Sequence, residues 1–197
     1  MAIYLLRHAE TDGNASRVVQ LPGAPLSARG RDQAARLARR LAGSGIARIV
    51  SSDLARALET AEALRTASGV PLDVDPALAE RNYGDVRGTP YSELSEDIFA
   101  ADYEPPGGET WAVFHARVDD AWDRVLRLAA DADGHLAVVS HGLVCEAILA
   151  RHLGGAPDDD VRRWGNTAVT IVEPPRTLRL LACTAHLDGG ATPGGAV

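Results

Sequence analysis

The sequence contains no lysine, and all 20 of its basic residues are arginine. That absence excludes Schiff-base catalysis by a lysine side chain and phosphate binding by a Walker-type lysine. The 27 acidic residues outnumber the arginines and give a formal net charge of -7 at pH 7. Because the arginines are interspersed with acids and form no basic run, we expect no nucleic-acid partner.

Cysteine, aromatic residues and long apolar runs are also scarce. Cys145 and Cys183 each lie inside an apolar segment, which indicates reduced thiols in the core of a cytoplasmic protein. Aromatic residues make up 5% of the chain and hydrophobic residues 46%, so the core should consist mainly of Ala, Leu and Val. No apolar stretch approaches the roughly 20 residues of a membrane span, and the chain starts directly with a strand pattern. We therefore expect a soluble protein with no membrane partner.

The sequence does contain a regular alternation of strand-like and helix-like segments. This alternation is typical of an α/β fold with a mostly parallel central sheet and helices on both faces. Ser27 and Thr110 are expected to cap helices, and a further helix should start at Ser51-Ser52-Asp53. We expect one domain over residues 1–185 and a loose tail over 186–197. Strands are predicted at 2–6, 46–50, 70–74 (an edge strand), 136–140, 167–172 and 178–183, and a last helix at 143–152.

Residues 76–110 interrupt this pattern with several glycines and prolines. A long irregular insertion in a compact domain is commonly functional, so we expect it to lie over an active site. From 88 to 116 the chain has no arginine, so a polyanionic substrate should be repelled there. The acids of this stretch are Glu93, Glu96, Asp97, Asp102, Glu104 and Glu109, and its aromatic residues, which suit a neutral or partly apolar leaving group, are Tyr91, Phe99, Tyr103, Trp111 and Phe114.

Two histidines stand where predicted buried strands end. His8 follows Arg7 after the segment 2–6, and His141 follows the segment 136–140. Because α/β enzymes place their chemistry at the carboxyl ends of their strands, this pair predicts an active site. A histidine at one strand end is by itself more often a structural polar group, and we interpret the other four in that way: His115, His135, His152 and His186.

Four separated motifs occur in a specific order: Arg7-His8-Ala9-Glu10-Thr11 with Asn14, Ser51-Ser52-Asp53-Leu54-Ala55-Arg56-Ala57, Glu80 before Tyr83-Gly84, and Ser140-His141-Gly142. Together they resemble the histidine phosphatase superfamily, in its branch of small-molecule phosphatases. The resemblance spans nearly the whole chain and implies a phosphoglycerate-mutase-like three-layer sandwich with an insertion over the active site. The family commonly has Gly where this chain has Ala9, an exchange that is harmless if φ is negative and costs about 1 kcal/mol if φ is positive.

The resemblance also implies a role for each residue. His8 would be the nucleophile that forms a phosphohistidine, Glu80 the general acid and then base, and His141 a donor to the phosphoryl oxygens. Glu80 would need a pKa raised by the neighbouring phosphate. Forked guanidinium groups suit the oxygens of a phosphate dianion, and Arg56 should lie in the first turn of a helix. The phosphate-binding set is Arg7, Asn14, Arg56 and His141.

No cofactor is implied, and the sequence favours no metal site. His135, His141, Cys145 and Glu146 are close in sequence, but no paired cysteine or histidine completes a tetrahedral ligand set.

The sequence therefore favours a metal-independent phosphoric monoester hydrolase. Its expected partner is a small-molecule phosphate monoester such as a sugar or alcohol phosphate. The alternatives are a phosphoglycerate mutase, a protein phosphatase and a non-catalytic phosphate-binding protein. The sequence leaves the assembly open, with a homodimer among the options.

Overall fold

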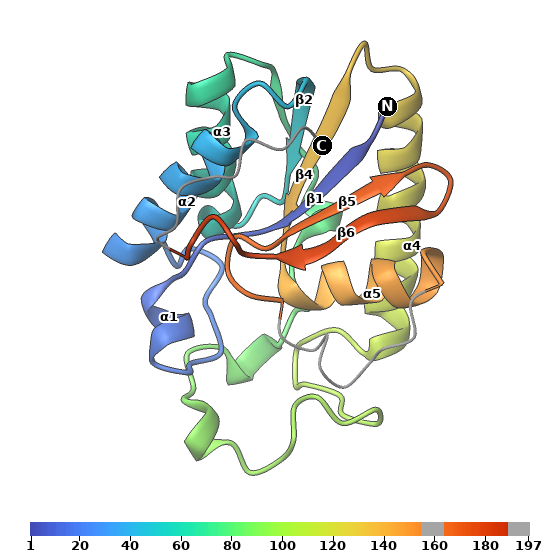
Figure 1. Ribbon diagram of the computed structural model, residues 1–197. Helices are drawn as coiled ribbons and strands as arrows, with labels where there is room; N and C mark the ends of the chain where they lie inside the picture. The colour runs from blue at the N-terminus through green and yellow to red at the C-terminus, as the bar shows by residue number, and fades with distance from the viewer. Residues whose placement is uncertain (155–163, 189–197) are drawn as a thin grey trace.

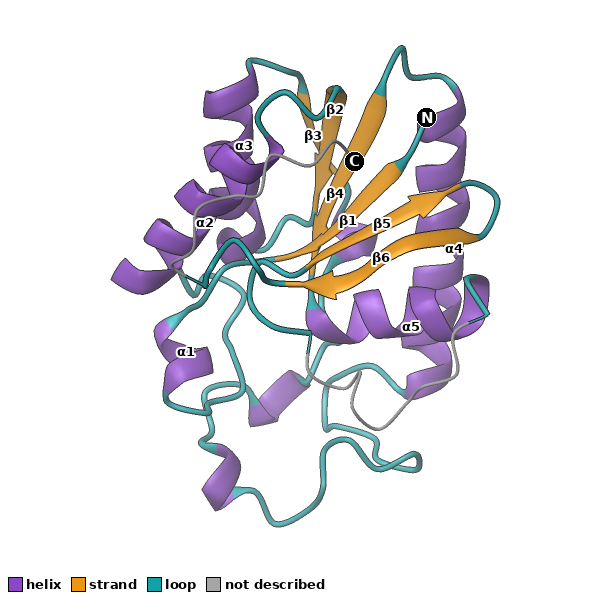
Figure 2. Ribbon diagram, in the orientation of Figure 1, coloured by secondary structure: helices purple, strands orange, loops and turns teal. Residues whose placement is uncertain are grey.

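A computed structural model describes residues 1–154 and 164–188 of the chain, and its centre is a six-stranded sheet in the order β3-β2-β4-β1-β5-β6 (Figures 1 and 2). The first four strands in this order are mutually parallel, whereas β5 runs antiparallel to both of its neighbours. The mostly parallel sheet predicted from the sequence is confirmed. Its strands are β1 (Ile3–Arg7), β2 (Ile46–Ser51), β3 (Leu72–Val74), β4 (His135–Ser140), β5 (Val169–Glu173) and β6 (Thr177–Cys183).

Helices cover both faces of the sheet and make the three layers that the sequence predicts. Figure 1 shows α2 (Ala28–Leu41) and α3 (Ala55–Ser68) on one side of the sheet, with α4 (Trp111–Ala130) and α5 (Gly142–His152) on the other. Strand β1 supplies both cores because successive side chains point to opposite faces. Ile3 and Leu5 pack into the core beneath α4 and α5, whereas Tyr4 and Leu6 pack into the core beneath α2 and α3.

Two of the predicted helix starts are confirmed and one is displaced. The side chain of Ser27 accepts a hydrogen bond from the Gly30 N–H at the start of α2, and Thr110 caps α4 in the same way. Helix α3 was expected to start at Ser51-Ser52-Asp53 but begins at Ala55, because Ser51 is still part of β2 and the Ser52 N–H donates to Val139 O on β4. A short helix, α1 (Asp12–Ala15), was not predicted.

The insertion over residues 76–110 is folded into short turns: η1 (Pro76–Leu78), η2 (Gly84–Val86) and η3 (Tyr91–Glu93). Its residues Tyr83, Ile98 and Tyr103 form a small core together with Val19 from the segment after α1, and it lies beside the carboxyl ends of β1 and β4 (Figure 1). Gly84 is required there, since its φ is +53° and a Cβ would lie 2.0 Å from the Pro106 carbonyl oxygen.

The end of the described chain packs against α2. His186, in the segment expected to be a loose tail, contacts Arg40 at 2.9 Å and Thr167 at 2.9 Å, and residues 189–197 lie outside the described residues. Cys145 is buried as predicted. The expectation of a core thiol is wrong for Cys183, which is only half-buried and accepts a hydrogen bond from Arg40, because β6 is an edge strand. None of the helices described is both long and apolar enough to cross a membrane.

Candidate active site

The pairing of two parallel strands brings His8 and His141 together. Arg7 at the end of β1 is in register with Ser140 at the end of β4, and the His8 N–H donates to the Ser140 carbonyl oxygen at 2.9 Å. Each histidine is the next residue along its strand, so both side chains leave the sheet at one point. Their ring centroids are 5.1 Å apart and both side chains are buried. The two predicted strand-end histidines therefore form one site.

One nitrogen of the His8 ring contacts a backbone oxygen, and the other has no hydrogen bond to any described residue. Nδ1 lies 2.7 Å from the Ala9 carbonyl oxygen, an acceptor only, so Nδ1 carries the proton and Nε2 keeps its lone pair. Burial lowers the pKa of His8 well below its usual value, and the charges of Arg7 and Arg56 lower it further. A neutral imidazole with an unprotonated Nε2 is the form that can attack phosphorus.

Ala9 stands where the related family commonly has glycine. Its φ is not positive, and its N–H donates to Thr60 Oγ1 at 3.0 Å. The methyl group packs with Leu26 and Ala34 in a small buried cluster. The exchange of glycine for alanine is therefore free of backbone strain.

His141 is oriented by a serine that the sequence reasoning did not single out. Its Nε2 lies 2.8 Å from Ser52 Oγ, and that oxygen also accepts a hydrogen bond from the Leu54 N–H. When the Ser52 hydroxyl donates to Nε2, the proton of the neutral ring stays on Nδ1. Burial lowers the pKa of His141 well below its usual value, and the nearby charge of Arg56 lowers it further. Within the ranges that the structure describes, Nδ1 is buried with no hydrogen-bond partner, so it is the nitrogen available to donate to a ligand oxygen.

Two arginines face the same space. Arg7 donates through Nη1 to the Trp164 carbonyl oxygen, and Arg56 donates through Nη1 to the Leu21 carbonyl oxygen at 3.2 Å. Arg56 lies in the first turn of α3, as predicted. In both residues Nε is buried without a partner in the described part of the chain. Burial lowers the pKa of Arg56 to about 10, which leaves it charged at neutral pH.

Two amide side chains also line this space. The Asn14 Oδ1 accepts from the Thr11 N–H and from Asn166 Nδ2, each at 3.2 Å. Gln20 Oε1 accepts from Thr11 Oγ1 at 2.7 Å. Because the oxygens of Asn14 and Gln20 are engaged and both residues line the pocket, their NH₂ groups are the donors left for a ligand. Asn14 was predicted to serve in this way, and Gln20 was not.

Glu80, the acid predicted for the site, lines the pocket together with Glu146. Its Oε1 accepts from the Arg81 N–H at 3.0 Å, and its Oε2 accepts from the Leu143 N–H at 3.3 Å. Burial raises the pKa of this carboxyl, while the two hydrogen bonds and the Arg56 charge oppose the rise. The raised pKa was expected from a bound phosphate, but burial already supplies it in the protein alone.

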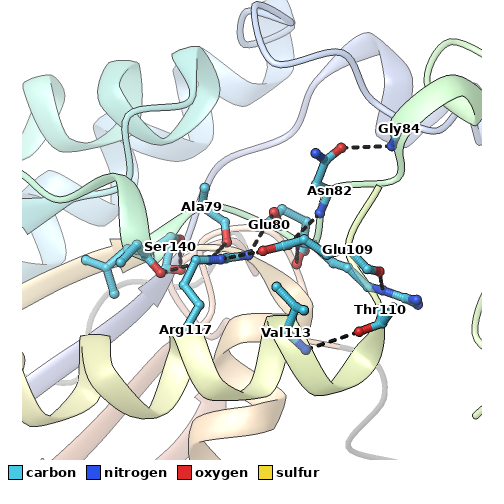
Figure 3. A network of polar contacts seen from close by, with 12 residues as sticks. Ala79, Glu80, Asn82, Gly84, Glu109, Thr110, Val113, Arg117 and Ser140 are labelled. Atoms are coloured by element: carbon cyan, nitrogen blue, oxygen red, sulfur yellow. Dashed lines mark hydrogen bonds and ion pairs between the residues drawn. The ribbon is translucent and has the colours of Figure 1, made fainter. Parts of the chain in front are cut away.

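An ion pair behind Glu80 anchors the loop that carries it (Figure 3). Arg117 reaches from α4 and donates to the carbonyl oxygens of Ala77 and Ala79, both at 2.8 Å, and to that of Glu80 at 3.4 Å. It also holds both oxygens of Glu109, at 2.8 and 2.7 Å. Glu109 Oε2 in turn accepts from the Asn82 N–H at 2.9 Å, so the pair fixes the backbone on both sides of Glu80.

A pocket of about 190 Å³ under the insertion is lined by Arg7, His8, Asn14, Gln20, Arg56 and Glu80, whereas His141 lies behind its lining, against the His8 ring. Its walls include Tyr83, Tyr91 and Phe99 from the insertion and the cation Arg87. The expected repulsion of a polyanionic substrate rests on a wrong premise, because none of the six acids in 88–116 lines the pocket. Glu109, for example, points at Arg117 instead. Of the five aromatic residues expected there, Tyr91 and Phe99 line the pocket and the others pack elsewhere.

The histidines considered as metal ligands are separated by the length of a strand. His135 begins β4 and accepts from the Ala2 N–H, whereas His141 follows the other end of β4. In the ranges 1–154 and 164–188, no three histidine, cysteine or carboxylate side chains are grouped so that they could hold a metal ion.

Known proteins resemble this chain in sequence and in structure. Residues 3–182 match the model of the histidine phosphatase superfamily (branch 1). A protein of Yersinia enterocolitica, named as a probable phosphoglycerate mutase GpmB, is 32% identical over 95% of each chain. The solved structure of Bacillus stearothermophilus YhfR has a TM-score of 0.81, with 29% identity over 94% of this chain and 98% of that one. A mycobacterial glucosyl-3-phosphoglycerate phosphatase, solved with VO3, has a TM-score of 0.76, with 27% identity over 91% and 97%.

Proposed function

The chain belongs to the histidine phosphatase superfamily, and from that premise we propose that it is a phosphatase of small-molecule phosphate monoesters that acts through a phosphohistidine on His8. One observation carries the proposal: a neutral His8 lines a pocket, and three buried donors beside its ring have no hydrogen-bond partner in the part of the chain that the structure describes. Those donors are Arg7 Nε, Arg56 Nε and His141 Nδ1. Buried polar groups are normally satisfied, so an anion is the ligand that this arrangement fits.

The first step transfers the phosphoryl group to the enzyme. Arg7, Arg56 and His141 bind the phosphoryl oxygens, and the lone pair of His8 Nε2 attacks phosphorus in line with the leaving oxygen. The bond between phosphorus and that oxygen breaks, and protonated Glu80 donates its proton to the leaving alkoxide. The products are an alcohol, a phosphohistidine and the Glu80 carboxylate.

The second step returns the enzyme to its starting state. The Glu80 carboxylate takes a proton from a water molecule as the water oxygen attacks phosphorus. The nitrogen–phosphorus bond breaks, its electron pair returns to Nε2, and inorganic phosphate leaves. The proposed steps use only side chains of this chain, so activity should survive treatment with a chelator.

Trapping the intermediate tests the proposal. Protein incubated with a labelled phosphate monoester and quenched by denaturation at alkaline pH should carry a phosphoryl group that later acid treatment removes in the wild type, and none in His8→Ala. His152→Ala is the matched control, because His152 pairs with Asp119 outside the pocket. A non-catalytic phosphate-binding protein would label in none of the three, and that result would overturn the proposal. Phosphate release from a panel of monoesters and phosphoproteins then separates a small-molecule phosphatase from a protein phosphatase.

A phosphoglycerate mutase is the second candidate, favoured by the likeness to the Yersinia protein named as one. A mutase returns the phosphoryl group from His8 to the substrate before water can attack. Incubation with 3-phosphoglycerate separates the two functions. A phosphatase releases inorganic phosphate in proportion to the substrate consumed, whereas a mutase forms 2-phosphoglycerate with little release.

A further inference from the structure

Two residues shortly before β5 hold parts of the active site. Asn166 Nδ2 donates to the His8 carbonyl oxygen at 3.1 Å and to Asn14 Oδ1 at 3.2 Å. The Thr167 N–H gives the His8 carbonyl oxygen a further hydrogen bond, at 3.3 Å. Because Asn14 Oδ1 is engaged in this way, the NH₂ group of Asn14 is left for a ligand in the pocket. The placement of Asn166 and Thr167 therefore sets the backbone at His8 and the orientation of a phosphate donor.

Thr167 needs support from its surroundings to keep its conformation. Its φ is +58°, in the left-handed region that a β-branched residue rarely adopts. Such a conformation persists only where the surrounding contacts enforce it. Thr167 is fully buried, and its hydroxyl donates to the Asn166 carbonyl oxygen at 2.7 Å. A contact from outside the site also reaches that hydroxyl, since His186 Nε2 lies 2.9 Å away.

The hydrogen bonds around His186 fix its protonation state. The Thr167 hydroxyl gives its single proton to a backbone carbonyl, so His186 Nε2 must donate to it. Arg40 Nη1 can only donate, so His186 Nδ1, 2.9 Å away, must accept. Burial lowers the pKa of His186 to about 4, with the charges of Arg40 and Arg36 adding to the fall and that of Asp188 opposing it. The ring is therefore a neutral bridge at neutral pH, with one role for each nitrogen.

Both α2 and the end of β6 hold the outer side of this bridge. Arg40, in the last turn of α2, also donates to the carbonyl oxygen and to Sγ of Cys183, each at 3.2 Å. The turn that carries His186 follows Cys183 and is closed by the Leu187 N–H, which donates to the Thr184 carbonyl oxygen at 2.8 Å. His186 thus connects the helix layer to the residues that hold the active site.

We propose that His186 is a positioning residue that acts on the active site through Thr167. It touches no reacting atom, and its ring keeps Thr167 in the conformation from which Asn166 reaches Asn14 and His8. Without the ring, Asn166 loses this placement and a bound phosphate loses the oriented Asn14 amide. The inference rests on the proposed function, because it concerns the same site, but phosphate binding can be measured without turnover.

Calorimetric binding of inorganic phosphate tests the proposal. His186→Ala should weaken the binding about tenfold, as the loss of one hydrogen bond would. His186→Gln should stay within about threefold of the wild type, because an amide also offers an N–H donor and an oxygen acceptor. His135→Ala is the matched control: it removes a half-buried histidine that accepts from the Ala2 N–H at the other end of β4, and it should bind phosphate like the wild type.

Two further variants test the route from His186 to the site. Asn166→Ala should itself weaken phosphate binding, and adding His186→Ala to it should cause little further loss, since the connecting amide is already absent. Arg40→Met leaves His186 in place but removes the donor to its Nδ1, and it should weaken binding about threefold. Arg40→Met and His186→Gln keep the test valid if urea unfolding shows that His186→Ala does not fold.

Several results would overturn the positioning role: wild-type binding by a folded His186→Ala or by Asn166→Ala, equal weakening by His186→Ala and His186→Gln, wild-type binding by Arg40→Met, or a further loss of about tenfold in the double variant. If the expected pattern of phosphate binding is found but the wild type releases no phosphate from any monoester, the positioning role stands and only the proposed function fails. A wild type that binds no phosphate would overturn both.

Discussion

Replacing Arg117 with lysine should slow catalysis by displacing Glu80, although Arg117 itself touches no reacting atom. Arg117 makes five hydrogen bonds, three to loop carbonyls and two to Glu109. A lysine ammonium has three N–H groups on one nitrogen, so it cannot reach the loop carbonyls and the Glu109 carboxylate at the same time. Each hydrogen bond of a charged group is worth about 1.5–3 kcal/mol. Because the side chains of Arg117 and Glu109 are 22% and 15% exposed, water replaces part of this stabilisation, and we expect a net weakening of about 2 kcal/mol.

A weakening of about 2 kcal/mol in the anchoring of the Glu80 loop corresponds to roughly a 30-fold fall in the equilibrium constant for the correctly placed carboxyl, and so to a fall of at most about 30-fold in its population. The fall should appear in kcat for an alkyl phosphate such as glycerol 3-phosphate, whose alkoxide needs a proton. It should be much smaller for 4-nitrophenyl phosphate, whose leaving group is a far weaker base. Arg151→Lys is the matched control, since Arg151 makes a two-pronged pair with Asp119 outside the pocket and its replacement should leave both rates unchanged.

A double-mutant cycle decides whether Arg117 acts through Glu80. Adding Arg117→Lys to Glu80→Gln should cause little further loss with the alkyl phosphate, because the acid is already absent. Equal slowing of both substrates by Arg117→Lys, or a full 30-fold further loss in the double variant, would refute the reasoning.

Three further results are expected. Ser52→Ala should lower kcat about tenfold, because His141 loses the hydrogen bond that keeps its proton on Nδ1; an unchanged rate would show that Ser52 does not set the tautomer. The acid limb of kcat/KM should lie well below pH 6.5, since only neutral His8 attacks, and Arg56→Gln should move it upward by removing a charge that disfavours the imidazolium; a downward shift contradicts the assignment. Gly84→Ala should lower the free energy of unfolding in urea by more than about 2 kcal/mol, against about 1 kcal/mol for Gly88→Ala, which has positive φ but open space; equal losses would show that the Pro106 contact is harmless.

The local parts of the fold and site were predictable from the sequence. Buried apolar strands and helix caps are encoded by neighbouring residues, so the strands before His8 and His141 could be placed, as could the helix that carries Arg56. The displaced start of α3 was not visible, because the bonds that extend β2 past Ser51 come from β4, far away in the sequence.

The parts of the site that depend on tertiary contacts could not be predicted. The roles of Ser52 and Arg117 follow from which groups face each other after folding, and no spacing in the chain encodes that. The composition of the insertion showed its charges but not their direction, so Glu109 was taken as a repulsive acid when it neutralises Arg117. Arg87 directly precedes the stretch without arginine, and apart from its nearness to Tyr83-Gly84 nothing in the sequence indicated that it would line the pocket.

The placement of β4 between β2 and β1 has a consequence for how the protein matures. During synthesis β1, β2 and β3 leave the ribosome first, yet β1 and β2 cannot pair with each other, because the position between them belongs to a strand that is made much later. Such non-local pairing is intrinsically slow and carries a high entropic cost. A nascent or truncated chain that ends before β4 holds His8 and both phosphate-binding arginines but lacks the strand that joins β1, which carries Arg7 and His8, to β2. Catalysis should therefore switch on only when β4 inserts, which keeps an unfinished chain from hydrolysing phosphate esters and makes the return of activity during refolding a direct measure of sheet completion.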